Sequence, residues 1–327
     1  MKLKINLKSK RKNKIQNRSV VGAIFYTSIA LILTLFTIVL TVILLWAILN
    51  SFKYGYDFDG GNYFGFPNYT DYEEFQVFDN FIDMITKFKI TTGNQTYYSR
   101  IFGEIVQPSK DVYFLQMLLY TLVYAGIGGF LQTIVPAIVA FILCKYKFKF
   151  SKILYAVALI VYIIPIVGNY PAMITLMRDI GIYNTLYGSL IQKFNFFGMY
   201  FFVFYAYYEN YSDAYLEAAE IDGANQWRVL TRIVLPMSAK LISTVFLISF
   251  VNLWNDYQSP LLYMPSYPTL AYGIYCLTSR SSGYLGTTVT TTMKFAGVIC
   301  TAAPIVILFI FLKDKLMANI SLGGIKE

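Results

Sequence analysis

Long apolar runs dominate this chain and constrain its fold more than any other feature. An α-helix needs about 20 mainly apolar residues to cross a bilayer. Five runs reach or approach that length: Val20–Leu49, Tyr113–Cys144, Ile153–Met177, Leu241–Pro260 and Phe295–Leu312. A sixth run, Phe194–Tyr208, is shorter and crosses if its helix extends by a turn at either end. The runs predict an all-α integral membrane protein with six transmembrane helices, folded as a single domain over residues 1–327.

The composition agrees with a membrane location. Hydrophobic residues make up 57% of the 327 residues and charged residues 14%, and the mean hydropathy is +0.52. A soluble domain carries about 25% charged residues, so most of this chain is expected in lipid or in a membrane-embedded core. No small-residue cleavage site closes the first run, which we therefore expect to be a retained anchor helix.

The distribution of the net charge of +9 predicts the topology. Residues 1–19 carry eight Lys or Arg and no acid, and residues 145–152 carry four Lys, whereas residues 50–112 carry five basic and nine acidic residues. Short basic loops stay in the cytoplasm. We therefore expect both termini, the 145–152 link and the 209–240 loop inside the cell membrane, with 50–112 as an external segment. A solvated basic tail explains residues 1–19 better than nucleic-acid binding does.

The external segment shows two local patterns. Its first part, residues 53–69, is rich in Gly, Asp, Asn and aromatic residues, which indicates turns. In Asp71–Phe88, apolar residues recur at helical spacing at Phe75, Phe78, Ile82 and Ile85, which predicts a short external helix.

Helix breakers gather inside two of the predicted spans. Gly126, Gly128 and Gly129 precede Pro136 in the second run, and Pro165, Gly168 and Pro171 lie in the third. Small residues let helices approach closely, and proline kinks a helix where neighbours satisfy the freed backbone. Ordinary bundle packing and a gating role both explain the pattern.

The sequence lacks the motifs of an intramembrane hydrolase or metalloprotease. The chain has no His, and its three cysteines, Cys144, Cys276 and Cys300, are too scattered for a disulfide framework or a metal site. It also lacks a G-x-S-x-G turn and a G-x-x-x-x-G-K-[ST] loop, so it cannot hydrolyse ATP by the P-loop route. We predict a protein that is not an enzyme and holds no metal or cofactor of its own.

The 209–240 loop predicts two helices joined by a sharp turn. Ser212 can cap the first helix and Asp213 is favourable in its first turn, while Gly223 supplies the left-handed residue that ends it. A second helix leads to Pro236 and the fifth run. An amphipathic helix resting on lipid headgroups is the alternative. Residues 209–222 contain five acids and no base, which favours a protein partner over an anionic leaflet.

Several motifs resemble those of binding-protein-dependent ABC importer permeases. Glu217-Ala218-Ala219, Gly223, Ile233 and Leu235-Pro236 have the spacing of their cytoplasmic EAA loop. Trp254-Asn255-Asp256 with Pro260-Leu261-Leu262 is similar to the WND…PLL stretch of maltose-type permeases, and 181–185 (GIYNT) to their external element. The tail 323–326 (GGIK) resembles that of the second permease subunit of carbohydrate importers.

The resemblance implies a mechanism and a set of partners. A homologous second permease subunit would complete a heterodimer, two ABC ATPase subunits would use ATP and Mg, and an extracytoplasmic solute-binding protein would deliver a sugar, an oligosaccharide or glycoside by subfamily. Membrane lipid surrounds the assembly. The residues implied in ATPase coupling are Glu217, Ala218, Ala219, Asp222, Gly223, Ile233, Leu235 and Pro236. The chain departs from the family in 207–212 and at Tyr120, where Asn is usual, and its external segment is longer.

Polar residues on the fifth run are candidates for the substrate path. Asn252, Asn255, Asp256 and Ser259 share one helix face. Asp at a helix centre costs about 2.5–3.5 kcal/mol, so such groups usually face a bundle interior or a water path. Asp256 lies near the end of its run, where an interfacial anchor is the alternative. Asn169 and Tyr170 are a second candidate pair on the path.

Other classes of function remain open at this stage. A secondary transporter needs acidic or His relays in mid-membrane, and these runs are nearly free of charge before Asp256. An importer of another solute, such as a glycerol phosphate, fits the same motifs, and a scaffold without transport is compatible with the composition.

Overall fold

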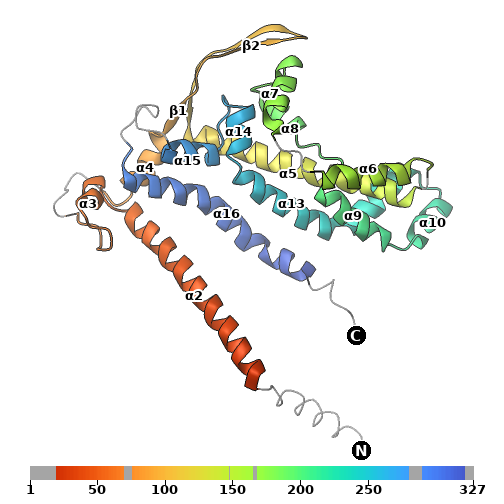
Figure 1. Cartoon of the computed structure of the whole chain (residues 1–327), viewed down its shortest axis with the longest axis horizontal. Helices are drawn as coiled ribbons and strands as arrows, with labels where there is room; N and C mark the ends of the chain where they lie inside the picture. Colours follow the sequence, from red (N-terminus) through yellow and green to blue (C-terminus); the bar gives the residue numbers. More distant parts are fainter. Residues whose placement is uncertain (1–19, 70–75, 147, 165–167, 280–288, 321–327) are drawn as a thin grey trace, which may run out of the picture. The chain divides into compact units, whose positions relative to one another are not determined.

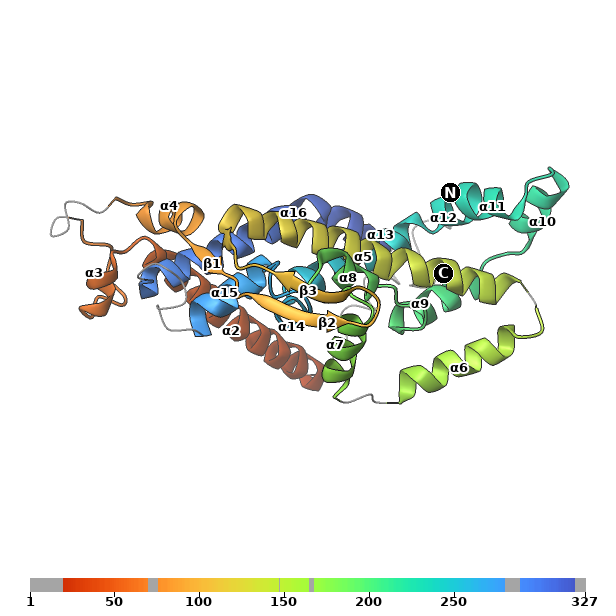
Figure 2. The ribbon, with the colours of Figure 1, turned by 90° about the horizontal axis from the view of Figure 1, so that it is seen from above.

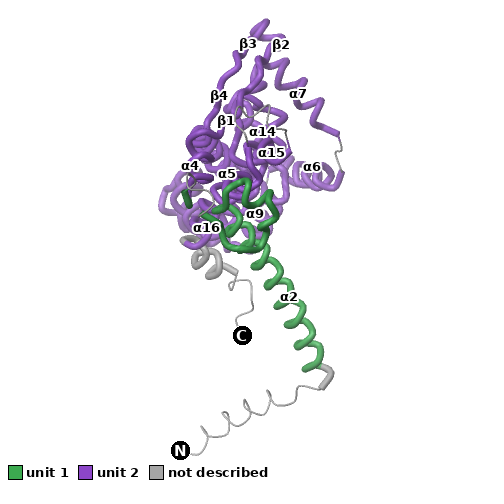
Figure 3. The backbone as a smooth tube through the Cα atoms, turned by 90° about the vertical axis from the view of Figure 1, so that its left-hand side faces the viewer, with its two compact units in different colours: residues 1–77 green, residues 78–327 purple. Residues whose placement is uncertain are grey.

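The computed structural model describes residues 20–69, 76–146, 148–164, 168–279 and 289–320, which form two compact units, residues 1–77 and 78–327 (Figure 3). The basic tail 1–19, the tail motif 323–326, Phe75 and Pro165 lie outside the described residues. The prediction of a single domain stays a prediction, because compactness alone does not separate functional domains.

The first unit is a long apolar helix followed by turns. Helix α2 (Val20–Ser51) carries no charged residue, and α3 (Gly55–Asp59) follows it. The turn-rich stretch closes on the Asp57 carboxylate, which accepts hydrogen bonds from Asn62 Nδ2 at 3.0 Å and from the Asn68 backbone N–H at 3.2 Å. Gly, Asp and Asn thus form turns here, as their conformational preferences predict.

The second unit begins with a predicted helix and continues with strands that the sequence analysis missed. Helix α4 (Asp79–Thr86) covers part of the predicted external helix. It is followed by β1 (Lys89–Thr91), β2 (Gln95–Ser99), β3 (Gly103–Gln107) and β4 (Asp111–Tyr113), which pair antiparallel as β1–β4 and β2–β3. The prediction of an all-α protein is wrong for this segment. Thr, Tyr, Ile and Val favour strands, and Gly103 at φ 75° makes the tight turn of the β2–β3 hairpin.

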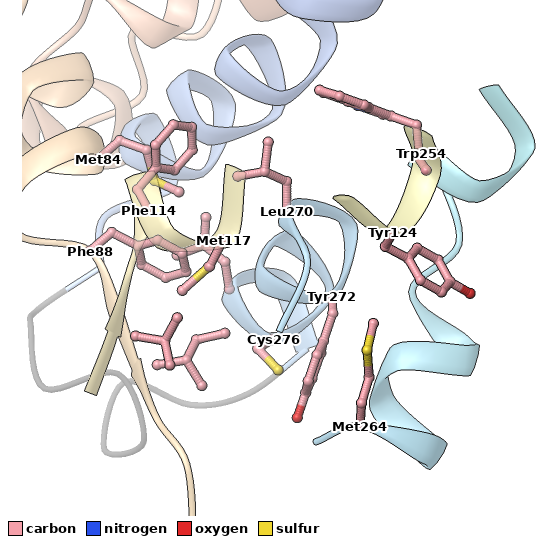
Figure 4. Close-up of a cluster of buried hydrophobic side chains, with 14 of the residues drawn as sticks. Met84, Phe88, Phe114, Met117, Tyr124, Trp254, Met264, Leu270, Tyr272 and Cys276 are labelled. Carbon is pink, nitrogen blue, oxygen red and sulfur yellow. The ribbon is translucent and has the colours of Figure 1, made fainter. Parts of the chain in front are cut away.

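Helix α5 (Phe114–Lys145) is the centre of the second unit (Figures 1 and 2). It packs along α9 (Met199–Glu209) and α13 (Ala239–Trp254). A Cβ on Gly129 would lie 3.2 Å from the backbone nitrogen of Phe250, so glycine permits the close approach of α5 and α13. Two apolar cores flank this contact. One of them gathers Met84, Phe114, Met117, Trp254 and Leu270 (Figure 4).

The remaining elements surround these helices. They are α6 (Ser151–Ile163), α7 (Asn169–Asp179), α8 (Leu186–Ile191), α10 (Ala214–Ile221), α11 (Gln226–Val229), the π-helix η1 (Leu230–Val234), α12 (Leu235–Met237), α14 (Gln258–Tyr263), α15 (Leu270–Ser279) and α16 (Thr291–Ile320). The chain is thus mostly helical, as predicted.

Fewer described helices than predicted have the length to cross a bilayer alone. Gly22–Ser51, Phe114–Lys145 and Thr291–Ile310 do, and the pair 226–237 and 239–254 adds a fourth crossing if it counts as one span bent by 73°. The third predicted span is divided into α6, which ends at Ile163, and α7, which begins at Asn169 directly after Gly168 at φ 75°. Helix α9 begins only at Met199 and has 11 residues. Three crossings, or four, are therefore supported by length and composition.

Candidate functional site

The 209–240 loop folds as an elbow whose turn is set by local chemistry. Helix α10 ends at Ile221, Gly223 follows with φ 74°, and the last carbonyls of the helix accept hydrogen bonds from the Gly223 N–H at 3.0 Å and the Ala224 N–H at 2.9 Å. A left-handed residue after a helix satisfies these carbonyls, and glycine does so without steric cost. Ser212 Oγ accepts a hydrogen bond from the Ala214 N–H at 3.3 Å at the other end of α10.

The second half of the elbow leads into the bundle through an irregular helix. Asn225 caps α11 by accepting a hydrogen bond at Oδ1 from the Arg228 N–H at 2.8 Å. The π-helical turn η1 and α12 follow, and α13 leaves at 73° from Ser238. Wide π-turns occur mostly as single-turn interruptions, frequently at functional sites.

One face of the elbow packs against the helix bundle. Ala219, Val229 and Leu230 are buried with Phe141 of α5 and Tyr208 of α9. Two predicted coupling residues, Ile233 and Leu235, are half-buried against the same cluster. They therefore hold the elbow on the bundle. Their role is to fix its position, in the same way as Ala219.

The opposite face is open and combines acids with large apolar side chains. Glu217, Ala218, Asp222 and Pro236 are exposed, as is Gly223. Ile221 is 86% exposed and Trp227 69% exposed. The sequence analysis did not select these two residues, although large apolar side chains in a soluble loop are the signal that would have found them. We name this exposed surface, defined by Glu217, Ala218, Ile221, Asp222 and Trp227, the elbow face.

The bond between Tyr146 and Gln226 ties the elbow to the end of α5. The Tyr146 hydroxyl donates to Gln226 Oε1, and Gln226 Nε2 donates to Glu220 Oε1 at 3.1 Å. Partial burial and, secondarily, the Glu220 carboxylate raise the pKa of Tyr146, so the phenol keeps its proton and acts as the donor.

The predicted path residue Asp256 lies in a polar cluster away from the elbow. Its Oδ2 accepts from the Tyr124 hydroxyl at 2.8 Å and its Oδ1 from the Ser259 N–H at 3.0 Å. The buried Lys193 places Nζ 5.1 Å from the centroid of the Tyr124 ring. Tyr124 and Lys193 were not predicted, because nothing in their local sequence points to a partner about 60 or more residues away.

The other predicted path residues are on the surface of the chain. Asn252 and Asn255 are exposed, and Asn255 Nδ2 donates to its own helix, at the Val251 carbonyl, at 2.9 Å. Asn169 and Tyr170 are exposed at the start of α7, where the Tyr170 ring lies 6.2 Å from that of Tyr263. The structure therefore does not gather the five predicted residues into one site.

The 181–185 element has a structural part in the fold. Asn184 is fully buried with φ 55°; its Nδ2 donates to Ser266 Oγ and its Oδ1 accepts from the Ser266 N–H, both at 2.8 Å. Thr185 caps α8 by accepting from the Gly188 N–H at 3.1 Å. Among the described residues no group of three or more His, Cys, Asp or Glu is arranged to hold a metal ion.

Comparison with known proteins gives the family. Residues 132–316, which include the elbow and Asp256, match the model of the family described as "Binding-protein-dependent transport system inner membrane component". The chain belongs to this family. The permease also resembles the melibiose/raffinose/stachyose import permease protein MelC of Bacillus subtilis, with 25% identity over 63% of this chain and 74% of the relative.

Two further relatives are sugar permeases by name. The arabinooligosaccharides transport system permease protein AraQ of Halalkalibacterium halodurans is 27% identical over 60% of this chain and 68% of its own. The maltose/maltodextrin transport system permease protein MalG of Vibrio vulnificus is 24% identical over 68% of this chain and 76% of its own. The fold is that of a chain in the crystal structure of a bacterial ABC transporter for the acidic polysaccharide alginate. Its TM-score is 0.64 at 18% identity, over 90% of this permease and 98% of that chain.

Proposed function

We propose that this permease is the second membrane subunit of an ATP-driven importer that moves a sugar, an oligosaccharide or a glycoside, into the cell by alternating access. Membership of the permease family and the sugar permeases among its relatives support the transport function. In this proposal a homologous permease forms a heterodimer with it, and a solute-binding protein delivers the solute outside.

The elbow face carries the proposal for energy coupling. Two ATPase subunits, which bind ATP and Mg, supply the motion, and one of them docks on this face. Carboxylates and large apolar side chains that are exposed together mark a protein-binding surface better than a lipid-binding one. Glu217, Ala218, Asp222, Gly223 and the exposed Pro236 would contact the ATPase, while Ala219, Ile233 and Leu235 would hold the elbow on the bundle.

The proposed topology places the elbow in the cytoplasm. It has six crossings with both termini inside, and α6–α7, α9 and the bent α12–α13 segment would complete the crossings within the assembled heterodimer. The concentration of Lys and Arg in residues 1–19 and 145–152 supports this orientation.

The test of coupling is a charge reversal on the elbow face. Glu217→Arg should reduce the amount of ATPase that co-purifies and abolish solute uptake, while the permease still inserts and assembles. Glu104→Arg, at an equally exposed site on the external strand β3, is the matched control and should leave both unchanged. ATPase binding and uptake that are unaffected by Glu217→Arg would refute docking at this face.

The test of the substrate class is uptake by cells that express the complete transporter. Radiolabelled raffinose, arabino-oligosaccharide, maltose and glycerol 3-phosphate should separate sugar import from import of a glycerol phosphate. Deletion of the ATPase should remove uptake. Uptake that survives this deletion would instead identify a secondary transporter.

A further inference from the structure

Lys145, the last residue of α5, makes a contact that the proposed coupling mechanism has not used. Its Nζ donates to Asp213 Oδ1 at 2.6 Å and to the Tyr211 carbonyl at 2.6 Å, immediately before α10. The Lys145 side chain is 8% exposed, whereas that of Asp213 is 64% exposed. The cation is thus built into the base of the elbow and fixed by two acceptors.

Because the Lys145 ammonium is buried, losing this contact costs more free energy than losing an ordinary surface ion pair. An ammonium removed from water must find acceptors, and loss of one partner leaves an uncompensated charge. Exposed pairs contribute little because water replaces either partner. Here water reaches Asp213 but hardly reaches Lys145, so the position of the loop at Tyr211 and Asp213 is set by the end of α5.

Two further contacts join α5 to the same elbow. Tyr146 reaches the turn of the elbow through Gln226 and Glu220. Phe141 lies in the apolar cluster with Ala219, Val229 and Leu230. The elbow is therefore held by α5 at its beginning, at its turn and along its buried face.

The backbone connection from the elbow to α13 is irregular, unlike the side-chain contacts from the elbow to α5. It passes through the π-helical turn Leu230–Val234 and a bend of 73°. A π-turn and a bend interrupt the regular hydrogen-bond ladder, whereas α5 continues from Lys145 to Phe114 as one helix that packs along α13 and α9. Side-chain contacts with α5 thus offer a more direct path than the chain itself.

We propose that Lys145 is a positioning residue that ties the coupling elbow to α5, so that displacement of the elbow by the ATPase moves α5 directly and not only α13. This inference rests on the proposed function, because it requires an ATPase on the elbow face. In this inference the Lys145–Asp213 ion pair transmits motion from the elbow to α5, and the transporter can assemble without it.

The test follows α5 and α13 separately in the reconstituted transporter, with the ATPase that co-purifies with it. In a background with Cys144, Cys276 and Cys300 replaced by Ser, spin labels are placed at Ile142→Cys on α5 or Ile248→Cys on α13, each paired with Val298→Cys on α16. All three sites are exposed. Double electron–electron resonance then measures each distance without nucleotide and with ATP and vanadate.

Both label pairs should shift with nucleotide in the parent protein. Lys145→Glu should reduce the shift of the α5 pair several-fold and leave the shift of the α13 pair, and Lys145→Glu combined with Asp213→Lys should restore the α5 shift. Lys149→Glu, at an exposed lysine four residues along the chain, is the matched control. If the Lys145→Glu transporter does not assemble, Asp213→Asn replaces it as the test variant, because it changes an exposed side chain. It should also reduce the α5 shift several-fold.

An unchanged α5 shift in Lys145→Glu or in Asp213→Asn would overturn the inference. Failure of the proposed function gives a different result, because the parent protein would then retain no ATPase or show no nucleotide-dependent shift at either pair. Equal loss at both pairs in an assembled Lys145→Glu transporter would also overturn it, since α13 would then depend on the same contact.

Discussion

Tyr124 of α5 and Asp256, 132 residues further along the chain, are joined by a hydrogen bond of 2.8 Å from the phenol to Oδ2. The same carboxylate accepts the Ser259 N–H at the start of α14, so one acid joins α5 to the turn between α13 and α14. Both oxygens of Asp256 are thus engaged within the chain. This arrangement fits a role of Asp256 in positioning these helices better than direct binding of a solute.

Removing this hydrogen bond should destabilise the permease. Tyr124→Phe keeps the buried ring and leaves Asp256 Oδ2 without its donor. Hydrogen bonds to charged groups contribute about 1.5–3 kcal/mol, so the unfolding temperature in detergent should fall measurably. Tyr187→Phe, at an exposed tyrosine of α8, is the control and should not change it. Equal unfolding temperatures for Tyr124→Phe and the parent would contradict this account.

Gly223→Ala should strain the elbow without creating a clash. A Cβ there meets no atom within 4 Å, so the cost is the left-handed backbone alone, about 1–2 kcal/mol. Gly223→Pro is more severe, because proline fixes φ near −65°. Uptake should fall in both, and most in the proline variant. Gly126→Ala, also with open space but within helix α5, should be neutral or slightly stabilising.

Trp227→Ala and Ile221→Ala should weaken ATPase binding and leave the fold unchanged. Both side chains are largely exposed, so their removal forms no cavity, while large aromatic side chains are frequent hot spots of protein interfaces. The measurement is the salt-resistant fraction of ATPase that co-purifies. Tyr98→Ala, at a site 72% exposed on the β2–β3 hairpin, is the control. Equal retention of ATPase in all three variants would refute the proposal that the ATPase docks on the elbow face.

Thr121→Val should destabilise the core near α15. The Thr121 hydroxyl accepts the buried Leu270 N–H at 2.8 Å, and valine leaves this donor without its acceptor, at a cost of about 1–3 kcal/mol. Thr133→Val is a matched control in the same helix, because the buried Thr133 hydroxyl donates only to its own helix, at Gly129. The unfolding temperature of Thr121→Val should be lower than that of Thr133→Val. Equal unfolding temperatures for the two variants would refute the role of the Leu270 contact.

The pairing of β1 and β4 should weaken in acid. Hydrogen bonds from Lys89 and then Thr91 hold the pKa of Asp111 below its ordinary value. A depressed carboxyl pKa adds stability above the ordinary value, and this is lost as the pH falls through the lowered one. The protection factors for amide hydrogen exchange at Ile90 and Val112, taken relative to the intrinsic rate at each pH, should therefore fall at low pH. Asp111→Asn should remove the dependence, and an unchanged pH profile in that variant would contradict the assignment.

The sequence alone determined the features that depend on local chemistry. Apolar runs predicted the membrane class, and Gly223 predicted the turn of the elbow. The strands at 89–113 were missed because strands of three to five residues leave only a weak periodic signal in a chain dominated by helices.

Only the tertiary structure decided which distant residues meet. Asp256 with Tyr124, Lys145 with Asp213 and the division of the elbow into a buried and an open face depend on how helices pack, and helical periodicity does not specify a partner. A long apolar helix follows from the sequence because each residue must suit the lipid around it and the helix satisfies its own backbone hydrogen bonds. A hydrogen bond between distant polar groups forms only where the packing of helices brings the two groups together, and that packing is a property of the tertiary structure.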